Sequence, residues 1–326
     1  MLHLSRRNFV TAALGLAGAL TVGATFAQSY PSKPIRLIVG YQAGGPTDMT
    51  ARLVATKLQI ALGQPVIVEN KVGAGSNIAS EFVAAAPPDG YTLLLAAAPI
   101  TINGFLYKNM KWDVQKSFEP IVNVMTAPAV LAVAKKLPVR TVSELVALAK
   151  KPPGQLTFGS TGNGGSQHLA GELLKQQAGI DLMHVPYKGA SAALNDLVAG
   201  HVDMVFMTSM SALPFLKSGN PRPLAVASAK RLPQLPDVPT FAESGFPGFE
   251  AQSWNGLFAP AKTPPEIIAR LNAEVNKALT APDVRETLMS QGAVVLGGSS
   301  ADFRQYVGRE VAHWGKLLKT LKISMD

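Results

Sequence analysis

Two stretches of the sequence combine glycines with hydroxyl-bearing and titratable residues, in a pattern that favours anion binding. The first stretch contains Tyr41, Gly44, Gly45, Thr47 and Asp48, and the second contains Ser160, Thr161, Gly164, Ser166 and His168. Each follows a short aliphatic run typical of a strand and precedes a helical pattern, so its glycines lie at a helix start. Free N–H groups and the positive end of the helix dipole attract an anion there. The alternative is a packed turn that binds nothing, and these stretches alone leave both open.

A third turn adds donors of the same kind. Gly75, Ser76 and Asn77 stand between an expected strand at 66–68 and an expected helix at 78–86. Their N–H, hydroxyl and amide groups suit binding rather than bond-breaking chemistry. None of the three turns matches G-x-G-x-x-G or a Walker loop, so a nucleotide site is not predicted.

The sequence offers little for catalysis. A serine hydrolase would need a G-x-S-x-G elbow, which is missing, and His168 lies two residues after Ser166, on a different side of the same helix. Asp203 is a candidate acid, although a lone carboxylate is more often a cap or a hinge hydrogen bond. The histidines show neither H-E-x-x-H nor i, i+4 spacing, so we expect no metal and no cofactor. With no cysteine, thiolate catalysis and disulfides are excluded.

Composition indicates a globular protein of two domains. The chain has 326 residues, of which 47% are hydrophobic and 16% charged. The net charge of +9 comes from 30 basic and 21 acidic residues without a block of like charge. We therefore expect no nucleic-acid partner, and interpret the excess as a mild field for small anions or as a solubilising surface.

The amino terminus has the features of an export signal. Arg6 and Arg7 precede an apolar run at 10–22, and Ala27 stands before Gln28. We predict a signal peptide over residues 1–27, with the arginine pair resembling the twin-arginine motif. No later apolar run reaches the length of a membrane helix, so a soluble, exported protein is expected.

Strand and helix patterns alternate twice along the chain. The expected strands of the first unit are 35–39, 66–68 and 91–97, and those of the second are 156–158, 182–187 and 202–207. Helices between them make each unit β-α-β-α-β, which predicts a parallel sheet. The diglycines that begin at Gly44 and Gly164 are 120 residues apart. We therefore predict two α/β lobes whose glycine turns face one cleft.

The remaining segments suggest how the lobes are joined. Extended runs at 122–125 and 129–134 flank Pro128 and predict one crossing, and a proline-rich connector through Pro247 predicts the other. Residues 99–120 look irregular, with Trp112 and Phe118 as core anchors. Capping boxes predict helix starts at Thr141 and Thr263, and Thr47 or Asp48 can cap the helix after the first turn. The final helices, near 283–289 and 301–321, are expected to pack on the first lobe.

These stretches together resemble the substrate-binding receptors of the tripartite tricarboxylate transporter family, also called the Bug family. The resemblance covers the whole expected mature chain and is carried by IVGYQAGGPTDMTAR (38–52), VENKVGAGSNI (68–78), LTFGSTGNGGSQHLAGEL (156–173), VPYKG (185–189), GHVD (200–203) and WNGLFAPAKTP (254–264). It implies a two-lobed periplasmic-binding-protein fold of type II-like topology, each lobe a mostly parallel sheet flanked by helices, with a hinged cleft. On this basis lobe 1 would comprise residues 28–127 and 248–326, and lobe 2 residues 128–247.

The resemblance also implies a function and a site. A small carboxylate would be held between the turns and passed to a membrane permease by a monomeric periplasmic receptor. The ligand-binding residues would be Tyr41, Gly44, Gly45, Thr47, Asp48, Gly75, Ser76, Asn77, Ser160, Thr161, Gly164, Ser166 and His168, with Asp203 as a further candidate. An exported enzyme acting on a carboxylated substrate and a receptor for a signalling partner are the alternatives.

The chain departs from the family pattern in both turns of the first lobe. Gly40-Tyr41-Gln42 replaces Pro-Phe-Pro, and Ser76 replaces a glycine. The added hydroxyls allow a more polar ligand. A branched side chain at Gly45 is expected to block the anion, and to strain the turn if φ there is positive.

Overall fold

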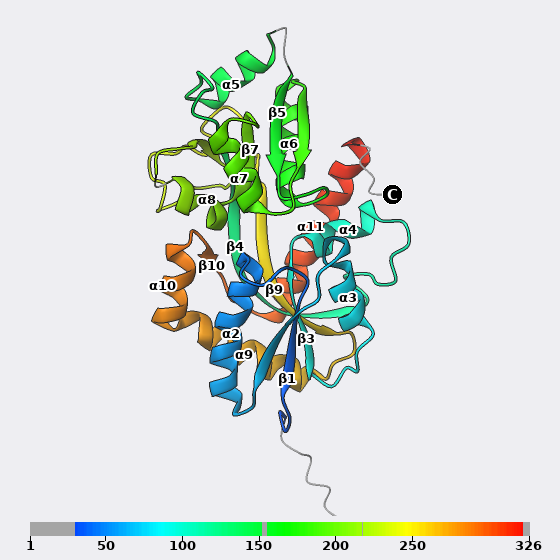
Figure 1. The fold of residues 1–326 in the computed structure, drawn as a ribbon. Coiled ribbons are helices and arrows are strands. Elements are labelled where there is room, and N and C mark those ends of the chain that lie inside the picture. The colour runs from blue at the N-terminus through cyan, green and yellow to red at the C-terminus, as the bar shows by residue number, and fades with distance from the viewer. Residues whose placement is uncertain (1–29, 152–154, 217, 322–326) are drawn as a thin grey trace, which may run out of the picture.

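The computed structural model describes residues 30–151, 155–216 and 218–321, so the expected signal peptide lies outside the described residues. Figure 1 shows two α/β lobes stacked along the long axis, with two long strands running between them. We call the lobe that carries β1 lobe 1 and the lobe that carries β5 lobe 2.

The lobe 1 sheet is mixed. Its strands are β2 (Val66–Asn70), β1 (Ile35–Val39), β3 (Thr92–Ala97), β9 (Gln252–Pro260), β4 (Phe118–Val133) and the short β10 (Val294–Val295). β1 pairs in parallel with β2 and β3, as the β-α-β-α-β pattern predicts, while β9 runs antiparallel to both β3 and β4. The return strand expected around residue 254 is therefore β9, which inserts between β3 and β4.

The lobe 2 sheet repeats this plan. Its strands are β7 (Met204–Thr208), β5 (Leu156–Ser160), β6 (Leu182–Pro186) and β8 (Arg222–Val226). β5 pairs in parallel with β6 and β7, and β4 runs antiparallel to β7 and β8. The two predicted parallel units are thus confirmed, each extended by antiparallel strands.

β4 belongs to both sheets. Its residues 118–128 pair with β9, and residues 129–133 pair with β7. The two extended runs expected around Pro128 therefore form one continuous strand. Beside it, the Ala129 N–H donates to the Ala251 carbonyl at 2.8 Å, where the chain returns to lobe 1 through β9.

Helices cover both faces of each sheet. In lobe 1, α2 (Pro46–Leu62), α9 (Pro265–Thr280) and α10 (Pro282–Ser290) cover one face, and α3 (Asn77–Ala84), α4 (Pro99–Leu106) and α11 (Ser300–Leu321) cover the other. Leu37 and Val39 enter the first core and Ile38 the second, because neighbouring strand residues point to opposite faces. Burial on both faces explains the unbroken aliphatic run of β1.

In lobe 2, α5 (Val142–Ala149) and α6 (Ser166–Ala178) pack on one face, with α7 (Ala190–Ala199) and α8 (Ser209–Leu216) on the other. The last helix, α11, packs on lobe 1 as expected, through Phe303, Val307 and Trp314. Its end also reaches lobe 2, where Gln176 Nε2 donates to Thr320 Oγ1 at 3.4 Å.

Some local expectations were wrong. Residues 99–120 include the helix α4, and neither Thr47 nor Asp48 caps α2, whose N-cap is Gly45. α9 begins after Pro264, and the Thr263 hydroxyl donates to the Pro260 carbonyl instead of capping the helix. The Thr141 box is confirmed: its hydroxyl accepts the Glu144 N–H at 3.1 Å. Trp112 and Phe118 are buried, as predicted.

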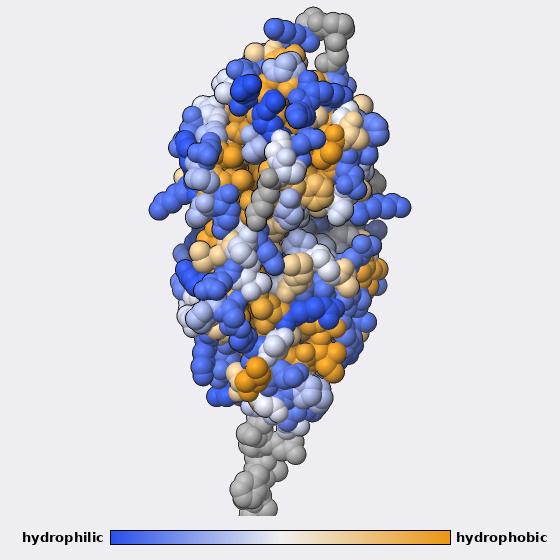
Figure 2. Space-filling view, turned by 60° about the vertical axis from the view of Figure 1, so that its left-hand side comes forward, coloured by the Kyte–Doolittle hydropathy of each residue, from blue (hydrophilic) through white to orange (hydrophobic). Residues whose placement is uncertain are grey.

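The face drawn in Figure 2 is mostly hydrophilic. Figure 2 shows apolar residues on this face as separate clusters among polar ones. No helix in the described part of the chain combines the length and apolarity needed to cross a bilayer.

Candidate functional site

The two glycine turns follow the carboxyl ends of equivalent strands. Residues 40–45 connect β1 to α2, and residues 161–165 connect β5 to α6. Both turns lie toward the region between the lobes (Figure 1). Because ligands of open α/β sheets bind outside the carboxyl ends of the strands, this is the candidate site.

The turns share one backbone design. Gly44 and Gly164 have φ of 80° and 72°, in the left-handed region that favours glycine, and the glycines after them are extended helix N-caps. The Gly44 N–H donates to Asp48 Oδ2 at 2.8 Å, and the Gly164 N–H donates to His168 Nδ1 at 3.0 Å. In both turns a side chain four residues on accepts the glycine N–H.

Asp48 organises the lobe 1 turn from inside. Its side chain is 2% exposed and also accepts hydrogen bonds from Arg52 Nε at 2.9 Å and Asn70 Nδ2 at 2.9 Å. Burial alone would raise the pKa of Asp48, but the bonds from Arg52, Gly44 and Asn70 outweigh it and lower the pKa. The carboxylate is therefore ionised and committed to the turn.

His168 has the corresponding place in lobe 2, within a stack of rings. Its imidazole lies 3.9 Å from that of His184 between ring centroids, and Phe158 lies beside the pair, 4.8 Å from His184 and 6.3 Å from His168. Burial, with the neighbouring His184 and Lys175 charges, lowers the pKa of His168 to about 3; burial and Lys175 lower that of His184 to about 4. Both rings are neutral at neutral pH.

Ser160 connects this stack to the turn. Its hydroxyl donates to the Gly162 carbonyl at 2.9 Å and lies 2.7 Å from His184 Nε2. Because Ser160 is fully buried and its proton is bonded within the turn, its hydroxyl is not an exposed nucleophile despite the contact with His184. Thr161 Oγ1 donates to Gln167 Oε1 at 3.1 Å and closes the turn further.

Groups that can meet an anion remain in the first turn of each helix. The first intrahelical bonds are Met49 N–H to the Gly45 carbonyl and Leu169 N–H to the Gly165 carbonyl. The N–H groups of Thr47 and Asp48, and those of Ser166, Gln167 and His168, precede them. In addition, Thr47 Oγ1 accepts from Asn255 Nδ2 at 3.1 Å, which leaves the threonine proton for another acceptor.

The third turn packs against the first. Ala74, Gly75 and Ser76 all have positive φ, and Asn103 Nδ2 holds the turn through the Gly75 carbonyl at 2.9 Å. A methyl group on Gly40 would lie 1.9 Å from Ser76 Oγ. Within the described part of the chain the buried Tyr41 hydroxyl has no hydrogen-bond partner, and burial, partly offset by nearby Ser76, raises the pKa of Tyr41.

Asp203 lies away from these turns. Its carboxylate accepts from the Thr157 N–H and hydroxyl, each at 2.9 Å, at the amino-terminal end of β5. The structure brings the other predicted residues to the three turns, whereas Asp203 bonds Thr157, and its part in ligand binding stays a prediction.

Sequence reasoning missed four residues that bond these turns or the helix starts after them: Asn70, Gln167, His184 and Asn255. Asn70 ends β2 at its carboxyl end, a position that the strand pattern could have singled out. His184 and Asn255 lie within strands, and only tertiary packing brings them to the turns.

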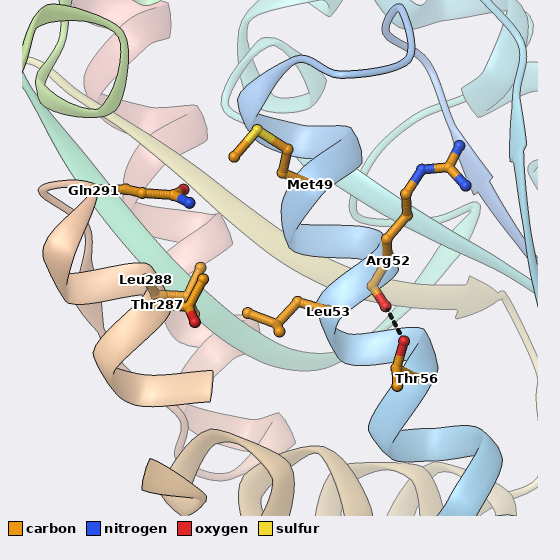
Figure 3. Close-up of a pocket in the computed structure, with 7 residues that line it drawn as sticks. All are labelled: Met49, Arg52, Leu53, Thr56, Thr287, Leu288 and Gln291. Atoms are coloured by element: carbon orange, nitrogen blue, oxygen red, sulfur yellow. Dashed lines mark hydrogen bonds between the residues drawn. The ribbon is translucent and has the colours of Figure 1, made fainter. Parts of the chain in front are cut away.

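A surface groove lies elsewhere, between α2 and α10. It has a volume of about 340 Å³ and is lined by Met49, Arg52, Leu53, Thr56, Thr287, Leu288 and Gln291. Figure 3 shows the Arg52 head turned away from the groove, consistent with its bonds to Asp48. Among the described residues, no group of three or more His, Asp or Glu could hold a metal ion.

The fold and the paired turns define a class: a two-lobed α/β solute-binding protein. Two solved structures share this architecture. Rpa4515 of R. palustris with adipate is 38% identical, covering 90% of this chain and 99% of that one, with a TM-score of 0.84. MatC (Rpa3494) from Rhodopseudomonas palustris with bound malate is 33% identical, covering 89% and 100%, with a TM-score of 0.80.

The sequence identifies the family. Residues 50–323 match the model of the "Tripartite tricarboxylate transporter family receptor". A UPF0065 protein from the tcbD-tcbE intergenic region of Pseudomonas sp. (strain P51) is 40% identical over 99% of this chain and 97% of its own length. The chain therefore belongs to the tripartite tricarboxylate transporter receptor family, and it is a solute-binding receptor rather than an enzyme.

Proposed function

We propose that this receptor works in the periplasm, where it binds a small carboxylate between the α2 and α6 turns and delivers it to a membrane permease. The observation that carries the proposal is the pair of equivalent turns, each with first-turn N–H groups at a helix start. The expected signal peptide supports the location. The adipate and malate of the two R. palustris structures support the ligand class.

We divide the predicted residues into those that contact the ligand and those that hold the site, according to the bonds that each already makes within its turn. Thr47, Ser166 and the third-turn residues Ser76 and Asn77 present hydroxyl, amide or N–H groups. By contrast, the Gly44 and Gly164 N–H groups and the Asp48 carboxylate are bonded within their turns. We assign these last three a supporting role, with no cofactor, nucleic acid or second copy of the chain involved.

A thermal-shift screen of dicarboxylates, tricarboxylates, hydroxy acids and acidic amino acids tests the ligand class. A ligand present at about a hundredfold its dissociation constant should stabilise the protein by roughly 2.7 kcal/mol. Calorimetry then compares Ser166→Ala, at the start of α6, with Ser290→Ala, on the exposed end of α10. The first should weaken binding by on the order of 1 to 3 kcal/mol if the hydroxyl meets the carboxylate, whereas the second lies outside the site. Failure of every carboxylate to stabilise the wild type would contradict the proposal.

A further inference from the structure

The two turns differ in charge although their backbones match. The residue that accepts the glycine N–H is a carboxylate in lobe 1 and an imidazole in lobe 2. A carboxylate ligand is attracted by helix N-termini, so a negative side chain at one terminus and a neutral side chain at the other must affect it differently.

In lobe 1 the start of α2 already holds an anion. The Asp48 carboxylate is buried in the first helical turn. Arg52 donates to it through Nε and Nη2, at 2.9 and 3.0 Å. Pro46, the first residue of α2, has no N–H to offer. Arg52 balances the charge of Asp48 but lies one turn further along α2, so the charge nearest the helix start is negative and the attraction for a second anion is reduced.

In lobe 2 the start of α6 holds no anion. Its first turn has no acidic residue, and Ser166, which corresponds to Pro46, contributes an N–H. Glu172 lies one turn further on, 3.9 Å from His168 Nε2, but Lys175 Nζ pairs with it at 3.2 Å. Among the residues that the structure describes, none thus supplies a counter-charge to the positive end of α6.

We propose that the α6 turn is the stronger of the two anion seats, and that His168 is a positioning residue that closes this turn without adding charge. This inference rests on the proposed function and deepens it, because it assigns the carboxylate to lobe 2. The lobe 1 turn then meets the rest of the ligand with the Thr47 hydroxyl and its neighbours.

The chain supplies its own test, because lobe 1 shows that aspartate can accept the glycine N–H at the equivalent position. His168→Asp should preserve the turn but place a negative charge beside the bound carboxylate. His168→Asn keeps a neutral acceptor, so the difference between these two variants isolates the charge. His201→Asp, at an exposed position of lobe 2, controls for net charge.

Calorimetry with adipate and with malate measures the effect. For whichever of these two ligands the wild type binds, the affinity of His168→Asp should be about tenfold or more below that of His168→Asn. The affinity of His201→Asp should differ little from that of the wild type. Affinities of the Asp and Asn variants that agree within about threefold would overturn the charge argument. A wild type that binds no carboxylate at all would instead contradict the proposed function.

Amide hydrogen exchange tests the positioning role without a ligand. The Gly164 N–H should be protected in the wild type and in both the Asn and Asp variants, and should exchange faster in His168→Ala, which has no acceptor. Equal protection in His168→Ala would show that His168 does not hold the turn.

Discussion

Gly40 and Ser76 lie in different turns, and the small size of Gly40 leaves room for the Ser76 side chain. The Ser76 side chain occupies the space that a side chain at Gly40 would need, since a methyl group there would lie only 1.9 Å from Ser76 Oγ. Both residues depart from the family pattern, and the contact between them means that the two departures depend on each other. Ser76 also has φ of 78°, which explains why glycine suits that position.

The left-handed glycine of the lobe 1 turn is Gly44, not Gly45. Gly44→Ala should reduce the free energy of unfolding by about 1 to 2 kcal/mol because φ is 80° there, while no atom of the described residues lies within 4 Å of the new methyl group. Gly45→Ala is the matched control, since its φ of −77° suits any residue and its new methyl group would only approach the Gln42 carbonyl, at 3.3 Å. Urea denaturation compares the two. A larger loss in Gly45→Ala would contradict this assignment.

The buried histidine pair makes stability depend on pH. The pKa values of His168 and His184, about 3 and about 4, lie below the 6.5 of an unfolded chain, so the unfolded chain takes up protons first as the pH falls. Stability should be full above pH 6.5 and decrease below it, by on the order of 1 kcal/mol per pH unit for each histidine.

Denaturation between pH 7.5 and 5 measures this slope above the range in which carboxylates titrate. The groups that face His168 are His184 on β6 and Glu172 and Lys175 on α6, with Asp181 beyond Lys175 at 3.7 Å. His168→Asn should reduce the slope to roughly half, because one of the two buried rings is removed. An unchanged slope in this variant would mean that other groups cause the pH dependence.

Elements were predicted best where local signals and tertiary packing agree. The residue patterns placed β1, α2, α7 and the strands of both parallel units within a few residues, because periodicity and glycine ends mark them directly. Two prolines led to expectations that the structure does not bear out. Pro99 begins α4, and Pro128 lies within β4 at the change from one sheet to the other, where no break occurs.

The capping box of α5 gives an element-scale test. Thr141 accepts the Glu144 N–H, and the Glu144 carboxylate accepts the Arg140 N–H at 2.6 Å. Thr141→Ala should reduce stability by about 1 kcal/mol, and Thr141→Ser should restore most of it. If Thr141→Ala and Thr141→Ser were equally stable, the cap would contribute nothing.

At the scale of the molecule, side-chain bonds tie the lobes beside α10 as well as at the end of α11. Ser209 Oγ of α8 donates to the Gly292 carbonyl at 2.7 Å, next to α10, and Gln234 Nε2 donates to the Met289 carbonyl at the end of that helix. The predicted lobe boundaries stay a hypothesis, but β4 and the start of β9 mark where the chain passes between the sheets. Sequence patterns indicated two crossings and could not show these ties, which depend on residues more than 50 positions apart.

Closure of the lobes is the last prediction. If one ligand contacts both turns, its binding free energy favours the arrangement in which both reach it, so saturation should shift the population toward the more compact form. Small-angle scattering should therefore give a smaller radius of gyration with the best ligand of the thermal-shift screen than without it. His168→Asp, at a ligand concentration that saturates the wild type but not the variant, should remain closer to the free form. A radius that does not change at saturation would show that the ligand is held without closure, and the permease would then have to recognise something other than a closed receptor.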